Sequence, residues 1–292
     1  MTLAPRAVVI HRATELDELL AHHGTRGQAA FFLTSRNRSI DEVVARHDAA
    51  DAALATVSAA IPLDWRRGTV ERADLARFLF APDDVIIVVG QDGLVANVAK
   101  YLDGQPVIGI NTDTVRNPGV LVAHQPDEVG ELLRSRDETE ARTMVEAITD
   151  DGQELRALNE IYLGHPSHQT ARYTITPPDA PAEPQASSGL IVATGTGATG
   201  WCRSVWLEHH SAFTLPQPTE PRLAWFVREA WPSPVTGTNC TEGELTDSGL
   251  AITIESEHLV LFGDGIETDN IGLTSGQRVI IRRAQSVLRL VR

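Results

Sequence analysis

The stretch from Asp84 to Asp113, DVIIVVGQDGLVANVAKYLDGQPVIGINTD, decides the fold. Its first apolar run, Val85–Val89, is β-branched throughout and predicts a fully buried strand. A helical pattern follows, and a second apolar run, Val107–Ile110, ends in Asn111-Thr112-Asp113. The order of strand, glycine-rich turn, helix and strand predicts one βαβ unit.

Polar residues follow both predicted strands. The turn Gly90-Gln91-Asp92-Gly93 comes after the first strand, and Asn111-Thr112-Asp113 comes after the second. Ligands of such units bind beyond the carboxyl ends of the strands, so we expect Asp92 and Asn111–Asp113 side by side on one rim. Glycines, a helix start and carboxylates suit phosphate and a divalent metal. For this turn alone, the alternative is an ordinary connection in which Asp92 caps the helix.

The rest of the chain divides into two predicted domains. Up to residue 125, strands alternate with helices, which predicts an α/β domain with a parallel sheet. Its other expected elements are strands at Arg6–Ile10 and Gln28–Leu33, helices at Thr14–His22, Asp41–Ala60 and Val70–Phe80, and a loop at 61–68. Residues 126–292 show few helices and predict a mostly antiparallel β domain, in which the proline-rich residues 177–189 form a surface loop. Whether the last strand returns to the first domain is left open.

Composition excludes several classes of function. The formal charge of −14 over 292 residues argues against non-specific binding of nucleic acid, although local backbone amides can still bind an anionic ligand. Cys202 and Cys240 are the only cysteines, so neither a disulfide framework nor a structural zinc site is indicated. No apolar run approaches the length of a membrane span, and the N-terminus lacks a signal-peptide core. We therefore expect a cytoplasmic protein without membrane partners.

Two further motifs lie in the second half. Gly195, Gly197 and Gly200 match the pattern G-x-G-x-x-G after a strand, but the acidic residue at the expected spacing, Glu220, precedes an apolar run instead of following one. A standard Rossmann site is therefore disfavoured, while the glycines still allow backbone amides to approach a nucleotide. The pair Asn159-Glu160 interrupts an apolar strand. It either ends the strand in solvent or holds ribose hydroxyls or adenine edges.

Together these motifs resemble the NAD kinase family, most closely the mitochondrial-type NAD kinases of eukaryotes and their bacterial relatives. The resemblance is carried by PVIGINTDTVR at Pro106–Arg116, RALNEIYLG at Arg156–Gly164 and SSGLIVATGTGATGW at Ser187–Trp201, together with the GQDG turn. It extends from about the second helix to the end of the chain. It implies an α/β domain, a β domain and an active site between them.

The resemblance also implies an activity and its residues. The activity is transfer of a phosphoryl group from ATP or polyphosphate to the 2′-hydroxyl of the adenosine ribose of NAD, with Asp92 as general base, Mg²⁺ as cofactor and a homodimer as the assembly. The implied residues on the side of the phosphate donor are Gly90, Gln91, Gly93, Asn111, Thr112 and Asp113. Those implied for binding NAD are Asn159, Glu160, Thr194, Thr196, Gly197, Thr199, Gly200, Trp201 and, more weakly, Asp264. No protein side chains are assigned as a dedicated metal site.

Two departures from the family pattern leave alternatives open. Gln91 stands where the family has a second glycine, and Leu94 stands where it has a threonine. If position 91 required a positive φ, Gln91 would cost on the order of 1 kcal/mol and reshape the phosphate loop. The alternatives are a sensor that binds NAD or another nucleotide without phosphoryl transfer, and a related kinase acting on another hydroxyl acceptor, such as a lipid or sugar.

Overall fold

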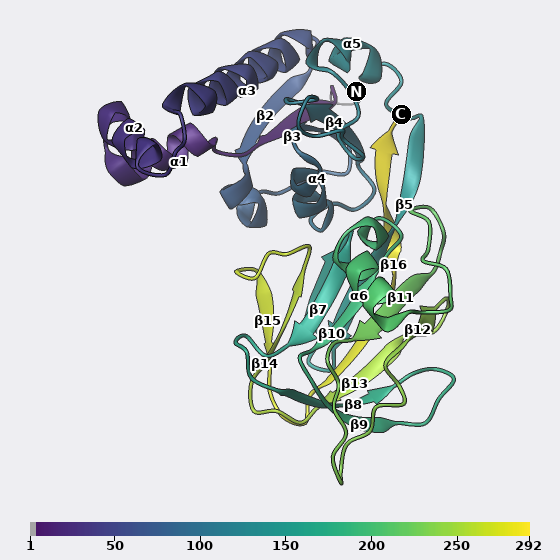
Figure 1. Cartoon of the computed structure of the whole chain (residues 1–292). Helices are drawn as coiled ribbons and strands as arrows, with labels where there is room; N and C mark the ends of the chain where they lie inside the picture. Colours follow the sequence, from purple (N-terminus) through teal and green to yellow (C-terminus); the bar gives the residue numbers. More distant parts are fainter. Residues whose placement is uncertain (1–3) are drawn as a thin grey trace. The chain divides into compact units, whose positions relative to one another are not determined.

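The computed structural model describes residues 4–292. Within this range the chain forms two compact units (Figure 1). The first extends to Glu140 and also includes Arg289–Arg292, while the second runs from Ala141 to Leu288. The expected α/β and antiparallel β architectures are both confirmed. The change of unit follows Glu140 instead of residue 125, because Val129, Leu132 and Leu133 pack in the core of the first unit.

The first unit is built on a parallel sheet whose strand order is β2-β1-β3-β4. These strands are β1 (Arg6–His11), β2 (Arg66–Glu71), β3 (Asp84–Gly90) and β4 (Pro106–Asn111). The end of β16 (Arg278–Val291) returns to this unit and pairs in parallel with β4, with Arg289 opposite Pro106. Strand β3 lies inside the sheet, and its run of β-branched residues is fully buried, as the sequence predicts.

Helices cover both faces of this sheet. Ala53 and Val57 of α3 (Ile40–Ala60) share a core with Val85, Ile87 and Val89 of β3. Figure 1 shows α4 (Asp92–Ala99) on the opposite side of the sheet from α3. The remaining helical segments are α1 (Glu15–His23), α2 (Arg26–Thr34), α5 (Val129–Leu132) and the 3₁₀ turns η1 (Arg72–Arg77) and η2 (Pro126–Glu128).

Three predictions for the first unit are wrong in whole or in part. The segment expected as a strand at Gln28–Leu33 belongs to α2, which begins after Thr25, and the Thr25 hydroxyl accepts a hydrogen bond from the Gln28 amide. The helix expected at Val70–Phe80 is present only as the shorter 3₁₀ turn η1, and its first residues belong to β2. The loop expected at 61–68 also contains the start of strand β2. This strand lies at the edge of the sheet and is mostly exposed, so it lacks the apolar pattern that marks a buried strand.

The second unit contains two layers of strands. A six-stranded antiparallel sheet has the order β12-β11-β10-β7-β14-β15. Its strands are β7 (Glu160–Gly164), β10 (Leu190–Ala193), β11 (Leu223–Val227), β12 (Glu242–Leu245), β14 (Leu259–Gly263) and β15 (Asn270–Leu273). The other layer has the order β16-β13-β8-β9, and β5 pairs with both β16 and β6. Its further strands are β5 (Thr139–Thr149), β6 (Glu154–Ala157), β8 (Ala171–Thr176), β9 (Glu183–Ser187) and β13 (Leu250–Ile254).

The main core of this unit lies between the two layers and takes side chains from both, such as Tyr173 of β8 and Leu163 of β7. The other face of the six-stranded sheet is covered by α6 (Trp201–His209), whose Cys202 and Val205 pack against Phe226. Strand β9 corrects the prediction that all of 177–189 is a loop. It pairs with β8 at the end of its layer, and an edge strand tolerates its proline, Pro184.

None of the helices in residues 4–292 is long and apolar enough to cross a membrane.

A buried ion pair fixes the start of β3 against β1, and its loss should destabilise the first unit. Asp84 is 1% exposed, and both of its carboxylate oxygens accept hydrogen bonds from the Arg6 guanidinium, at 2.7 and 2.5 Å. We expect Asp84→Ala to lower the free energy of unfolding by about 3 kcal/mol, because it leaves a partly buried cation unpaired. The neighbouring pair of Asp83 with Arg66 is exposed, so Asp83→Ala should change it by less than about 0.5 kcal/mol. Urea denaturation followed by circular dichroism measures both, and equal midpoints for the two variants would contradict the assignment.

Candidate active site

The turn after β3 leads directly into α4. Gln91 is the residue before the first turn of the helix, with φ −117° and ψ 163°, and its side chain makes no capping hydrogen bond. Asp92 is the first residue of α4, so the alternative in which Asp92 caps the helix does not hold. The extended backbone at Gln91 also means that this position does not require glycine.

The Asp92 carboxylate is held by three successive backbone amides. Leu121 and Val122 donate to Oδ1 at 2.8 and 3.0 Å, and Val120 donates to both Oδ1 and Oδ2, at 3.1 and 3.0 Å. An ionised carboxylate offers about four lone-pair positions. The shared bond from Val120 is the only one of these that reaches Oδ2, so Oδ2 keeps capacity to accept a further hydrogen bond.

Close packing of glycine allows this loop to approach Asp92. A Cβ at Gly109, on the buried strand β4, would lie 1.9 Å from the Leu121 carbonyl oxygen. Gly119 has φ +72°, and a Cβ there would lie 2.3 Å from the Val122 carbonyl oxygen. Larger residues at either position would push the loop away from the carboxylate. The amides of 120–122 were missed by the sequence analysis, and Pro118-Gly119 after the strand is the only local sign of a tight loop.

Asn111 uses both ends of its side-chain amide within the same loop. Its Nδ2 donates to the Asn117 carbonyl oxygen at 2.9 Å, and its Oδ1 accepts from the Asp113 amide at 2.9 Å. The residue is 3% exposed, so the second N–H of Nδ2 is also largely shielded from solvent. Thr112 is half-buried, and the Asp113 carboxylate lies 3.6 Å from the Arg116 guanidinium. The βαβ pattern predicts the proximity of the turn to Asn111–Asp113, and Gly90 lies opposite Asn111 in the sheet. The contact of Asp92 with residues 120–122 was not predicted.

In the second unit the apolar strand expected around Asn159-Glu160 is divided into β6 and β7, with a break at Leu158-Asn159. Asp264 holds this break. Its Oδ2 accepts from the Leu158 amide at 3.0 Å and its Oδ1 from the Asn159 amide at 2.6 Å, while the Asp264 amide donates to the Glu160 carbonyl oxygen. Asp264 has φ +54°, an uncommon conformation for a residue other than glycine. The structure thus joins Asp264 to the Asn159-Glu160 pair.

The glycine-rich loop packs directly on the same break. The Thr194 hydroxyl donates to the Leu158 carbonyl oxygen at 2.5 Å and accepts from the amides of Thr196 and Gly197. A Cβ at Gly197 would lie 2.3 Å from the Asn159 carbonyl oxygen, which explains the glycine by packing inside the unit. The Thr196 hydroxyl is buried without a hydrogen-bond partner, whereas Thr199 and Gly200 are exposed.

The glycine pattern is not a Rossmann fingerprint. That motif belongs to a parallel βαβ unit, and here the preceding strand, β10, pairs antiparallel with both β7 and β11.

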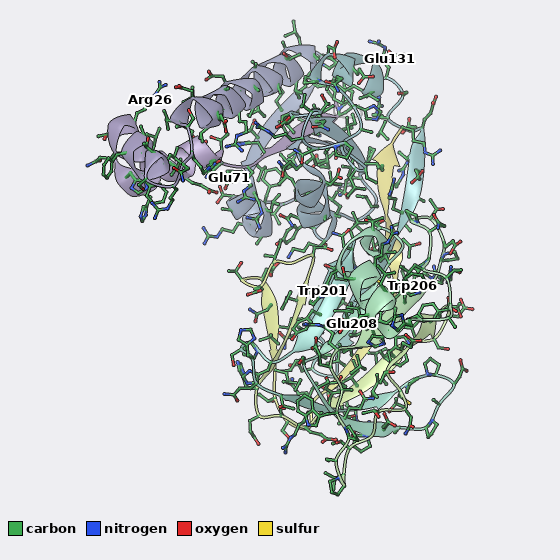
Figure 2. All side chains as sticks on the ribbon, viewed as in Figure 1. Arg26, Glu71, Glu131, Trp201, Trp206 and Glu208 are labelled. Carbon is green, nitrogen blue, oxygen red and sulfur yellow. The ribbon has the colours of Figure 1, made fainter. Side chains whose placement is uncertain are left out.

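Trp201 begins α6, and Figure 2 shows it on the same helix as Trp206. Its indole stacks on the Tyr162 ring, with centroids 5.6 Å apart, and the Arg228 guanidinium lies 5.1 Å from the indole centroid. Trp201 is therefore packed within the unit and also partly exposed, and it has a cation over its ring.

The environment of Glu160 favours its neutral form. Burial raises the pKa of this carboxyl to about 7, and the negative charge of Asp264 adds to the shift. Burial also raises the pKa of the nearby Cys202 thiol to about 12, and the charge of Glu160 contributes to that shift. Cys202 is therefore a packing residue and not a reactive thiolate.

Comparison with known proteins places these features in context. No protein-family profile matches the chain. The NAD kinase of Chlorobaculum tepidum is 29% identical over 140 residues, which is 46% of this chain and 47% of that protein. The NAD kinase of Saccharophagus degradans is 34% identical over 133 residues, 41% of this chain and 44% of that protein. NAD kinase 2, mitochondrial, of Rattus norvegicus is 28% identical over 167 residues, 40% of this chain and 39% of that protein.

These alignments cover less than half the length of the curated relatives. The fold comparison covers far more. The crystal structure of an NAD kinase from Archaeoglobus fulgidus in complex with ATP matches 98% of this chain and 93% of that chain, with a TM-score of 0.60 and 16% identity. The chain therefore shares the fold of that protein. With the sequence matches, the shared fold confirms the resemblance to the NAD kinase family that the motifs indicate.

The shifted pKa of Glu160 makes stability depend on pH. Because folding raises this pKa from 4.5 to about 7, the folded state binds the proton more tightly than the unfolded chain does. The resulting stability is fully present below about pH 4.5 and is lost as the pH rises through about 7. We expect Glu160→Gln to remove this dependence, which amounts to at most about 3 kcal/mol.

The measurement is urea denaturation of both proteins between pH 5 and pH 8, with the exposed Glu154→Gln as matched control. A wild-type slope that survives in Glu160→Gln would show that Glu160 does not titrate in this range.

Proposed function

We propose that this chain is an NAD kinase, which transfers a phosphoryl group from ATP or polyphosphate to the 2′-hydroxyl of the adenosine ribose of NAD. The observation that carries the proposal is the Asp92 carboxylate, fixed by three amides on the carboxyl rim of the sheet with acceptor capacity left on Oδ2. The similarity to NAD kinases in sequence and fold supports it.

In this proposal Asp92 acts as the general base. The 2′-hydroxyl oxygen attacks the terminal phosphorus of the donor, the bond from that phosphorus to the bridging oxygen breaks, and the hydroxyl proton passes to Oδ2 of Asp92. With ATP as donor the leaving group is ADP. Enzymes of this class work mainly by positioning and by stabilising charge, so a carboxylate held by three amides suits the task.

The remaining predicted residues keep their proposed roles, except Asn111, whose side-chain amide is engaged within its own loop. On the donor side, the turn of Gly90, Gln91 and Gly93 and the exposed part of Thr112 and Asp113 would face the phosphates. On the NAD side, the residues proposed to surround the adenosine are Asn159, Glu160, Thr194, Thr196, Gly197, Thr199, Gly200, Trp201 and Asp264. A Glu160 carboxyl that is partly neutral near pH 7 can donate a hydrogen bond to a ribose or adenine acceptor as well as accept one.

Mg²⁺ belongs to the same proposal. In the part of the chain that the structure describes, no group of three or more His, Cys, Asp or Glu side chains is arranged to hold a metal. In this proposal the ion is bound through one or two carboxylates together with the substrate phosphates. Asp113 would hold the ion on the rim, and the ion would offset charge on the transferring group.

A homodimer is proposed from the resemblance alone, whereas the cytoplasmic location is proposed from the composition of the chain. The two free cysteines, Cys202 and Cys240, agree with a reducing compartment.

The sensor alternative rested on Gln91 and Leu94, and the kinase with another acceptor rested on the Asp-containing turn, which resembles that of lipid and sugar kinases. The extended backbone of Gln91 removes the expected strain, so that argument for a nucleotide sensor no longer holds. Leu94 is buried, and its Cδ2 would lie 3.2 Å from a Cβ at Gly90, so it packs beneath the turn. Its replacement of threonine still removes a hydroxyl, and the sensor and the kinase with another acceptor remain distinct outcomes of the following test.

Purified protein should form NADP from NAD with ATP or polyphosphate and Mg²⁺, and Asp92→Asn should lower kcat by about 10²–10⁴-fold. Asparagine keeps an oxygen for the three amides but replaces the second oxygen with a donor, so the fold should persist. Asp83→Asn, an exposed aspartate of the same unit, is the matched control.

Each result has a separate meaning. NADP formation that is undiminished in Asp92→Asn would remove Asp92 from the chemistry. Binding of NAD in calorimetry without NADP formation from either donor would identify a sensor, and no binding of NAD would indicate another acceptor.

A further inference from the structure

Asn111 ends β4 at the rim that carries Asp92, and the family resemblance places it among the residues for the phosphate donor. Its surroundings indicate a different task. The side chain is 3% exposed, and each end of its amide has a partner in the chain: Nδ2 donates to the Asn117 carbonyl oxygen and Oδ1 accepts from the Asp113 amide. Nδ2 carries a second N–H, but a side chain that is 3% exposed and held at both ends offers little of it to a ligand in solvent.

The loop after β4 is anchored at three levels. At its base, the Asn111 amide donates to the His124 carbonyl oxygen and the His124 amide donates to the Gly109 carbonyl oxygen. In its first half, the Asn111 side chain spans the turn between Asp113 and Asn117. In its second half, the amides of 120–122 donate to Asp92.

The second and third anchors are in contact. A Cβ at Gly119 would lie 2.8 Å from Nδ2 of Asn111 and 2.3 Å from the Val122 carbonyl oxygen. The Asn111 amide therefore lies directly against the residue that precedes the three amides. If Asn111 lost its bond to Asn117, the segment that carries these amides would lose its lateral support.

We infer that Asn111 is a positioning residue for Asp92, acting through the loop 117–122, and not a ligand of the phosphate donor. The positioning itself is a property of the first unit, and its consequence for catalysis rests on the proposed function. Asparagine suits this position because one side chain must both donate to a carbonyl and accept from an amide. Aspartate keeps the acceptor but lacks the donor, and alanine lacks both.

The inference separates two effects on the reaction. Loss of positioning changes where Oδ2 of Asp92 points, so it lowers kcat while the affinity for the donor is kept. Loss of a direct phosphate contact raises KM for the donor instead.

Hydrogen exchange measured by NMR or mass spectrometry tests the positioning without requiring activity. The amides of 120–122 should exchange at least about tenfold faster in Asn111→Ala and Asn111→Asp than in the wild type. Asp92→Ala is the positive control, because it removes the acceptor of all three amides. Asn117→Ala is the matched control, because it removes a side chain from the same loop but keeps the carbonyl that Asn111 contacts, and its exchange should stay within about twofold of the wild type.

Exchange in α3 reports whether the unit as a whole is weakened, and we expect it to be unchanged. Unaltered exchange of 120–122 in Asn111→Ala would overturn the inference, as would an equal acceleration in α3.

Kinetics then connect the loop to the reaction. We expect Asn111→Ala to lower kcat for NADP formation by about tenfold or more, with KM for ATP within about twofold of the wild type. A raised KM for ATP with unchanged kcat would overturn the inference in favour of a donor contact. A wild-type protein that forms no NADP would defeat the proposed function, while the exchange experiment would still decide the role of Asn111.

Discussion

The three backbone amides that converge on the Asp92 carboxylate connect the turn after β3 to the loop after β4. Much of the local sequence serves this contact. Gly109 interrupts a buried strand, where glycine normally weakens packing, because any side chain there would collide with the loop. Gly119 supplies a positive φ next to the three amides. The contact therefore constrains two strands, a helix start and a loop at once.

The second unit also has a carboxylate that accepts hydrogen bonds from successive backbone amides, but there it affects the charge of a neighbouring residue. Asp264 accepts two successive backbone amides at the break between β6 and β7, just as Asp92 accepts three in the first unit. The charge of Asp264 lies near Glu160, and with burial it raises the pKa of that carboxyl to about 7. One carboxylate thus shapes the backbone, while its neighbour is kept partly neutral. The carboxylates of both motifs therefore have a structural role, because they hold backbone amides in the protein itself.

The pattern of apolar residues predicted the strands at the centre of each sheet correctly, but it did not reveal the strands at the sheet edges. The β3-α4-β4 segment was predictable because its strands are buried on both faces and read as continuous apolar runs. Strands β2 and β9 lie at sheet edges, where exposed arginines or a proline hide the pattern. Helix α2 was mistaken for a strand because Phe31, Phe32 and Leu33 resemble an apolar strand, although Phe31 is 78% exposed.

The candidate site shows the same division. Asp92 and Asn111–Asp113 were predictable as neighbours, since parallel strands end at one edge. The partners of Asp92 were not, because backbone amides carry no residue-specific signal and depend on how a loop folds back. For the same reason, the role of Asn111 was not visible until the partners at both ends of its amide were known.

The departures at Gln91 and Leu94 follow from the same geometry. The backbone at Gln91 is extended, so a side chain fits there without strain, and it is exposed where the turn meets solvent. Leu94 points the other way and is buried under Gly90. The turn therefore presents a side-chain amide to solvent and an apolar side chain to the interior, and its backbone at Gln91 accommodates both. Because the loop after β4 holds Asp92 independently of both residues, substitutions in the turn can leave the carboxylate in place.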